Sequence, residues 1–162
     1  MLKIVGVFLA GVGVVACHLC LISPPQRGSM LGLNKAASPD CLRLTPPCGG
    51  VKPVEPNMMI RDGMNYTVTF QKNLDHYLKT SPGHFDIAIG TMAVSPNEND
   101  TIIDLVRIMD RGEPSLHLYT INVTIPRNEH GHKLRYIQVR YTTMNPSAPA
   151  VFYQCGDFFI FQ

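Results

Sequence analysis

Polar and apolar residues alternate with a period of two along much of the chain, as in β-strands that have one buried and one exposed face. The apolar sets are Tyr66, Val68 and Phe70; Phe85, Ile87 and Ile89; Tyr119, Ile121, Val123 and Ile125; and Ile137, Val139 and Tyr141. Residues 152–161 predict a closing strand, whereas residues 102–109 fit either a strand or a short helix. The pattern therefore predicts an all-β protein.

Turn signals separate these predicted strands. Pro82-Gly83 and Asn145-Pro146 interrupt the alternation, and the chain contains 13 Gly and 13 Pro. Such breaks suit short strands joined by turns better than long helices. A chain of 162 residues has room for one domain. We therefore expect a single antiparallel β-sandwich of the immunoglobulin or fibronectin-III-like type.

Residues 18–57 are rich in Pro, Gly and Cys and show little periodicity. We expect one short strand near Leu19 to Ile22, followed by a long loop. A structureless loop of this length is unusual in a compact domain. Disulfide bonds would supply the missing constraint.

The first seventeen residues have the features of a secretory signal peptide. Lys3 precedes an apolar run from Ile4 to Ala16, which is too short to span a bilayer well. Cleavage after Ala16 would resemble a bacterial lipoprotein site and leave Cys17 first. Cleavage after Cys17 would leave His18 first and a mature domain of residues 18–162.

Cysteine parity favours the second cut. Without Cys17 the chain keeps four cysteines, an even number suited to two disulfides in an oxidising compartment: Cys20, Cys41, Cys48 and Cys155. Three Asn-X-Thr sequons, at Asn65, Asn99 and Asn122, agree with secretion from a eukaryotic cell and are candidate glycosylation sites. In the predicted strands Asn65 and Asn122 fall on the polar face. The protein is thus expected to be extracellular.

Composition narrows the function classes. Lys and Arg number 14 against 12 Asp and Glu, a net charge of +2, so a strongly basic nucleic-acid-binding surface is not expected. The sequence contains no Gly-rich phosphate loop, no serine nucleophile elbow and no HExxH motif. Catalytic residues are therefore not assigned from motifs.

His18 at a new N-terminus would be the most informative residue. Its α-amine and ring Nδ1 together form a six-membered chelate, and one further imidazole completes a T-shaped set of three nitrogens. Such a set suits one Cu(II) ion. The α-amine also loses its proton to a metal near neutral pH. If the cut falls elsewhere, His18 is an ordinary buried or surface residue.

Five histidines are candidates for the second imidazole: His76, His84, His117, His130 and His132. His76 follows the strand that ends near Phe70, and a loop after a rigid strand is well placed to present a ligand. His130 and His132 flank Gly131 in a polar turn, which is more typical of a solvated hairpin tip. His76 is therefore the preferred partner of His18.

Several segments, taken in order, resemble one family. Four segments are similar to the lytic polysaccharide monooxygenases, including the chitin-active group: His18 followed by Pro24-Pro25-Gln26-Arg27-Gly28, the stretch from Phe70 to His76, residues 83–89, and the closing segment Ala150-Val151-Phe152-Tyr153-Gln154-Cys155-Gly156-Asp157. Pro47-Cys48-Gly49-Gly50 is more similar to a sister group, the copper-acquisition factors of fungi. The resemblance covers most of the predicted mature chain.

The resemblance implies a copper-binding histidine brace formed by His18 and His76. In the oxidative enzymes an aromatic residue of the closing strand shields the axial position, and Phe152 matches that place best, with Tyr153 beside it. In the sister group an aspartate takes this role, which makes Asp157 a candidate ligand. Alternation puts Asp157 on the face of Tyr153, opposite Phe152, and Asp157 could equally be an exposed acid or a partner of Arg27.

The resemblance also implies the disulfide pairs Cys48–Cys155 and Cys20–Cys41, although spacing alone leaves three pairings open.

Three functions follow from these residues. The first is a secreted, monomeric copper-binding protein for copper acquisition or handling, with a polysaccharide or a membrane copper transporter as partner. The alternative is a copper-dependent monooxygenase acting on chitin or a related glycan. The chain has no Trp and only Tyr77 as a local aromatic, which weakens that alternative. The third is an extracellular adhesion or matrix module in which the histidines are incidental.

Overall fold

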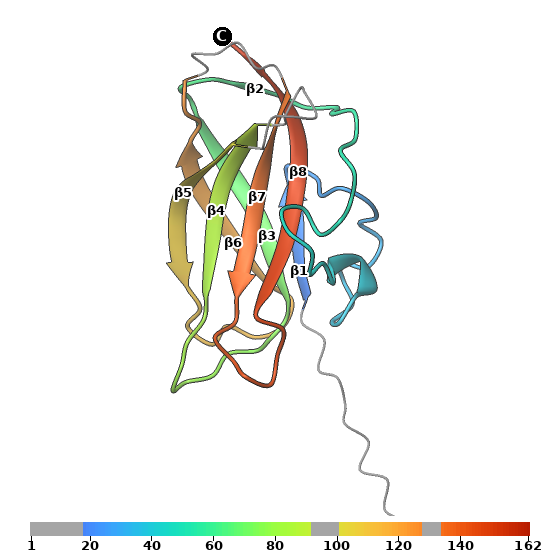
Figure 1. The fold of residues 1–162 in the computed structure, drawn as a ribbon, viewed down its shortest axis with the longest axis vertical. Helices are drawn as coiled ribbons and strands as arrows, with labels where there is room; N and C mark the ends of the chain where they lie inside the picture. The colour runs from blue at the N-terminus through green and yellow to red at the C-terminus, as the bar shows by residue number, and fades with distance from the viewer. Residues whose placement is uncertain (1–17, 92–100, 128–133) are drawn as a thin grey trace, which may run out of the picture.

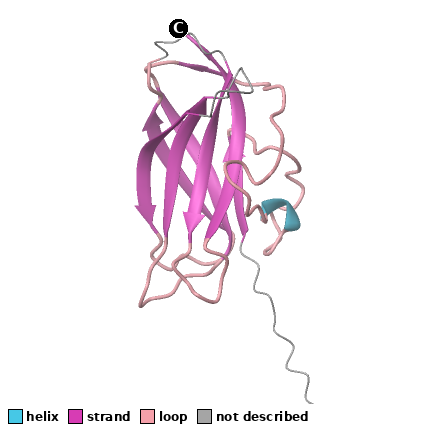
Figure 2. Cartoon of the chain, in the orientation of Figure 1, coloured by secondary structure: helices cyan, strands magenta, loops and turns pink. Residues whose placement is uncertain are grey.

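A computed structural model describes residues 18–91, 101–127 and 134–162. The predicted signal peptide, the sequon at Asn99, and His130 and His132 lie outside these residues. The chain folds as two β-sheets packed face to face (Figures 1 and 2). The elements are β1 His18–Ser23, the 3₁₀ turn η1 Pro39–Cys41, β2 Met59–Arg61, β3 Asn65–Leu74, β4 His84–Thr91, β5 Thr101–Met109, β6 His117–Thr124, β7 Leu134–Thr142 and β8 Val151–Phe161.

One sheet has the order β1-β3-β6 and the other the order β2-β8-β7-β4-β5. All neighbours are antiparallel except β2, which runs parallel to β8. The expected all-β sandwich is confirmed, and residues 101–109 form a strand rather than a helix. Among the described residues, no helix is long and apolar enough to cross a membrane.

An aromatic stack joins the two sheets in the core. Phe70 of β3 stacks on Tyr119 of β6, with ring centroids 4.8 Å apart, and Phe85 of β4 stacks on Tyr141 of β7 at 4.3 Å. Phe70 and Phe85 meet across the interface at 5.2 Å. All four rings are buried. Stacked and tilted aromatic pairs contribute beyond their buried area, so this cluster fixes how the sheets face one another.

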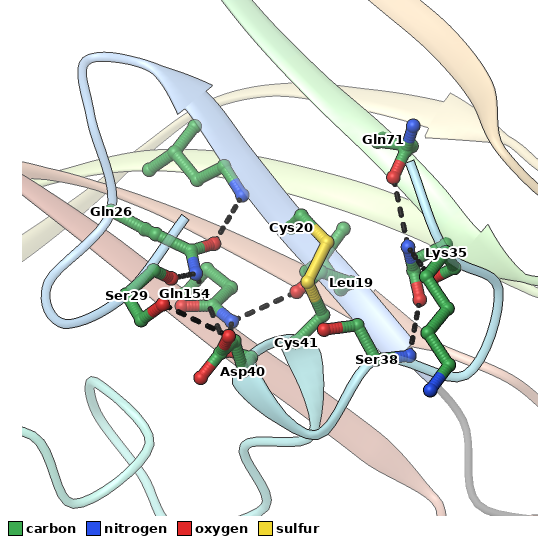
Figure 3. The surroundings of a disulfide bond; sticks show 12 residues. Leu19, Cys20, Gln26, Ser29, Lys35, Ser38, Asp40, Cys41, Gln71 and Gln154 are labelled. Atoms are coloured by element: carbon green, nitrogen blue, oxygen red, sulfur yellow. Dashed lines mark hydrogen bonds between the residues drawn. A yellow bond between two sulfur atoms is a disulfide. The ribbon is translucent and has the colours of Figure 1, made fainter. Parts of the chain in front are cut away.

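The long segment between β1 and β2 packs on the outer side of β8 and is held by disulfide bonds (Figure 1). The bonds are Cys20–Cys41 and Cys48–Cys155, the pairs that the family resemblance implies. Figure 3 shows Cys41 of η1 bonded to Cys20 of β1, with Gln26 and Gln154 beside them. The loop is thereby attached to both sheets, and the disulfide constraint expected from the sequence is confirmed.

Gly156 allows this segment to cross the closing strand. A Cβ atom at Gly156 would lie 2.7 Å from the carbonyl oxygen of Pro25 and 2.8 Å from that of Pro24. The crossing is completed by a hydrogen bond from the amide of Arg27 to the carbonyl of Cys155 at 2.8 Å. Because backbone carbonyls rather than flexible side chains occupy the space, only glycine fits this approach.

Candidate metal centre

His18 and His76 meet at the end of the sandwich where β1 begins. β1 starts at His18, whose register partner on β3 is Leu74, two residues before His76. Both histidines are buried, with exposed fractions of 2% and 5%. The charge of His18 also lowers the pKa of His76, as expected for imidazoles within electrostatic reach of each other. The two residues singled out by sequence therefore lie together.

The His76 ring is held in a form that can bind a metal. Burial lowers its pKa most, Asp75 partly opposes this by raising the pKa, and His18 lowers it further. The imidazole is therefore neutral at neutral pH, the form in which histidine binds metals. Its Nε2 atom is buried and has no hydrogen-bond partner among the described residues. A buried polar atom without a partner costs about 1–3 kcal/mol, which metal binding would offset.

The donors fit a histidine brace and not an all-side-chain site. Within residues 18–91, 101–127 and 134–162, no three His, Cys, Asp or Glu side chains come together around one point. A brace needs two imidazoles and a main-chain amine. His18 and His76 would supply the imidazoles, and the amine of His18 becomes a donor once the chain starts there.

The remaining described histidines are engaged elsewhere. His84 Nε2 lies 3.6 Å from Asp86 Oδ2. His117 meets the ring of Tyr119 edge-on at 4.8 Å. His117 pairs with Lys72 on β3, and Lys72 pairs with Leu19 on β1, so His117 is two strands away from β1. With strands about 4.8 Å apart, this places the backbone of His117 about 10 Å from that of β1.

The closing strand brings Phe152 to the same end of the sandwich. β8 begins at Val151, whose partner is Thr142, and Thr142 pairs in turn with His84 at the start of β4. Gln154 Nε2 donates to the carbonyl of Leu19 at 2.9 Å, which fixes β8 against β1. The end of the sandwich that holds His18 and His76 is called the site end. Phe152 lies two residues nearer this end than Gln154, on the same face of β8, and is fully buried. Tyr153 points to the opposite face, by alternation.

Asp157 is occupied by an ion pair far along β8. Its carboxylate accepts hydrogen bonds from Arg27 Nε and Nη2, the latter at 2.7 Å, and from the amide of Val54 at 2.9 Å. It lies three residues past Gln154, about 10 Å farther from the site end. Of the three roles that the sequence left open, copper ligand, exposed acid and partner of Arg27, the structure supports the last, and Asp157 is removed from the candidate ligands.

Sequence reasoning missed Lys72, which lies buried beneath the His76 loop. Its Nζ donates to Asp110 Oδ1 and to the Glu113 carbonyl, both at 2.8 Å, and forms an ion pair with Asp75 Oδ1 at 2.5 Å. Lys72 follows Val68 and Phe70 on the inward row of β3. A lysine that continues an apolar alternation was the available signal.

The Lys72 ion pairs connect the aromatic core to the loops of the site. Tyr141 donates its hydroxyl to Asp110 Oδ2 at 2.5 Å, and Tyr119 donates to Glu113 Oε2 at 2.7 Å. These hydroxyls belong to two rings of the aromatic stack that joins the sheets. The loop carrying His76 is thus anchored, through Lys72, to rigid parts of both sheets.

Two neighbouring loops hold the His76 loop from its other side. Asn145 Nδ2, in the β7–β8 loop, donates to the carbonyl of His76 at 3.1 Å. The ring of Tyr77 packs against Gly112 of the β5–β6 loop, where a Cβ atom would lie 3.0 Å from the ring. Gly112 also has φ +87°, a left-handed backbone conformation that favours glycine. The lower end of Figure 1 shows these loops together.

Comparison with solved structures shows which fold this is. The catalytic domain of a lytic polysaccharide monooxygenase from Listeria monocytogenes is similar over 90% of this chain and 100% of its own, with 18% identity and a TM-score of 0.53. A polysaccharide monooxygenase studied by X-ray photoreduction is similar over 89% and 100%, with 15% identity and a TM-score of 0.53. The chain has the lytic polysaccharide monooxygenase fold.

At these identities the similarity concerns the fold alone. The chain spans 54% of another such monooxygenase, solved in complex with zinc, at 15% identity and a TM-score of 0.42. No protein-family profile matches the sequence, and no curated protein sequence matches it significantly.

Lys72→Met should destabilise the fold by about 3–5 kcal/mol, because it leaves the buried carboxylate of Asp110 without its cation. Urea unfolding measures this change. The matched control is Lys79→Met, which replaces an exposed lysine of the same loop and should stay within about 0.5 kcal/mol of the parent. Equal stability of the two variants would contradict the assigned role of Lys72.

Stability should also fall as the pH drops from 4.5 toward 2. Partial burial alone would raise the pKa of Glu113, but hydrogen bonds from the Tyr119 hydroxyl and the Arg111 amide lower it from 4.5 to about 2. The unfolded chain therefore takes up this proton first, and acid favours unfolding. Glu113→Gln should flatten this part of the stability–pH curve, whereas Glu55→Gln, at an exposed position, should not.

Proposed function

We propose that this chain is a secreted copper protein that oxidises polysaccharide, with His18 and His76 as the brace. The observation that carries the proposal is the arrangement at the site end of the sandwich. Two buried imidazoles lie together there, and Phe152, rather than a carboxylate, lies on the adjoining end of the closing strand. This favours the monooxygenase over copper acquisition, which was the leading interpretation of the sequence.

The removal of Asp157 from the ligand set supports the oxidative function over copper acquisition. A carboxylate ligand would stabilise Cu(II), because an anionic hard donor favours the higher charge, and would thereby hinder reduction. Arg27 and the amide of Val54 hold this carboxylate elsewhere. The donors left at the site are nitrogens, and the nearby closing strand contributes an apolar ring.

The protein's own residues would prepare the site in three ways. Burial keeps the His76 imidazole neutral, so that no proton has to leave it at neutral pH. Lys72 and Asn145 fix the loop that carries His76. Phe152 supplies a fully buried apolar ring at the site end of the closing strand. Copper, when bound, would supply the one-electron chemistry with oxygen or peroxide.

One observation favours copper storage or delivery as a second candidate. Aromatic rings exposed near the metal suit binding to flat polysaccharide surfaces, and the chain has no Trp. Tyr77 is only half-exposed, and its ring packs against Gly112 with Lys72 Nζ 6.0 Å from its centroid. A crystalline polymer would therefore meet few exposed rings here, which favours storage or delivery over oxidation of such a polymer. If the protein does oxidise a glycan, a soluble or amorphous glycan is the better substrate class.

Copper binding is tested first. In protein that begins at His18, His76→Ala should weaken Cu(II) binding at least tenfold, because one of three nitrogen donors is lost. Isothermal titration measures the affinity. His117→Ala is the matched control, an imidazole on a neighbouring strand, and should leave the affinity unchanged. If the His76 variant keeps the parent affinity, the second imidazole is wrongly assigned.

The oxidative function is tested with copper-loaded protein, a reductant and peroxide. Mass spectrometry should detect oxidised oligosaccharides released from amorphous chitin or a related soluble glycan, and the His76→Ala variant should release none. Copper binding without oxidised products from any of several polysaccharides would favour the storage or delivery function. If protein that begins at His18 does not bind copper, both copper functions are wrong. The extracellular adhesion or matrix module would then be the remaining candidate function.

A further inference from the structure

Two Asn-X-Thr sequons face each other across neighbouring strands. Asn65-Tyr66-Thr67 belongs to β3 and Asn122-Val123-Thr124 to β6. The antiparallel register pairs Asn65 with Thr124 and Thr67 with Asn122. The four polar residues lie on the outer face of the three-stranded sheet and are all exposed, whereas Val123 between them is buried. The sequence alone shows two separate motifs, but the fold joins them into one patch.

Each asparagine is hydrogen-bonded to the threonine of the other motif. Thr67 Oγ1 donates to Asn122 Oδ1 at 2.6 Å, and Thr124 Oγ1 donates to Asn65 Oδ1 at 2.9 Å. Both contacts use the amide oxygen. Neither amide nitrogen, Nδ2, has a hydrogen-bond partner among the described residues. The atoms to which a sugar is attached are therefore the ones that the folded patch leaves available.

We propose that Asn65 and Asn122 form one doubly occupied N-glycosylation site on the outer face of the three-stranded sheet. The proposal rests on export through a eukaryotic secretory pathway but does not depend on copper. In each transfer, the bond from sugar C1 to a lipid pyrophosphate donor breaks and a bond from C1 to Asn Nδ2 forms. The amide loses one proton, and the lipid pyrophosphate leaves.

The folded patch is compatible with two glycans. Attachment replaces one hydrogen of Nδ2 and leaves Oδ1 able to accept the same threonine hydrogen bond. Asn65 and Asn122 are diagonal neighbours, roughly 7–8 Å apart across the strand pair. The motifs are far apart in the sequence and meet only after β3 and β6 pair, so each can be modified on the unfolded chain without hindrance from the other.

The patch lies away from the candidate metal centre. Asn65 is the first residue of β3, and Leu74, the partner of His18, is the last. Nine residues of strand at about 3.3 Å each separate the ends by about 30 Å. Glycans at this patch would cover the outer face of β3 and β6 while leaving the His18 end accessible.

The test is site-by-site peptide mapping of the full chain secreted from a eukaryotic host. Enzymatic removal of the glycan converts each occupied Asn to Asp, so mass spectrometry scores Asn65 and Asn122 separately from Asn99. We expect both sites of the pair to be occupied on the same molecules, with two glycan masses in the intact protein. Thr67→Ala should remove the glycan at Asn65 only, whereas Thr67→Ser should retain it.

Three results would overturn the proposal. A chain with no glycan at Asn65 and Asn122 would do so, whether it fails to enter the secretory pathway or its sequons are skipped. A chain carrying a glycan at only one of the two would also do so. The third is gain of a glycan at Asn122 only after Asn65→Gln, since this would show mutual exclusion. Copper titration of the same deglycosylated protein tests the proposed function independently.

Discussion

The buried ammonium group of Lys72 is the interaction on which the candidate metal centre depends. It lies inside the end of the sandwich with no exposed side-chain surface and reaches three oxygen acceptors on two loops. A buried cation is tolerated only when it is paired and hydrogen-bonded, so both loops are bound to one geometry. Because His76 follows Asp75 directly, its position is set by the same constraint.

The aromatic stack and the ion pairs form a continuous path from the core to the site. Tyr119 and Tyr141 each contribute a ring to the core and a hydroxyl to an acid of the β5–β6 loop. A phenylalanine at either position would preserve the stacking but remove one hydrogen-bond donor from a carboxylate of this loop. The polar tips of these tyrosines therefore explain why the core at this end contains tyrosine.

Period-two alternation predicted β3, β4, β6 and β7, and with them the sandwich. It could not assign residues 102–109 to a strand or a helix, because every residue of that edge strand is exposed or only half-buried and its apolar residues do not alternate strictly. β2 was not predicted, because a strand of three residues at the sheet edge is too short to show a period-two pattern. The two candidate brace residues could be proposed from the sequence, because the predicted cleavage makes His18 the first residue. The residues that surround His76 could not be predicted. The partners of Lys72 at Asp110 and Glu113 are about forty residues away and come together only by folding.

Asp157 shows how a long-range contact changes a chemical interpretation. On sequence it was the acid of the closing strand and so a candidate copper ligand. In the fold, Arg27 lies 130 residues earlier in the chain and reaches it because the segment after β1 crosses β8 at Gly156. The guanidinium also lies over the ring of Tyr136, 5.2 Å from its centroid, so the pair anchors the long loop. The same crossing that attaches the loop thus holds the carboxylate away from the candidate metal centre, where His18, His76 and the ring of Phe152 lie.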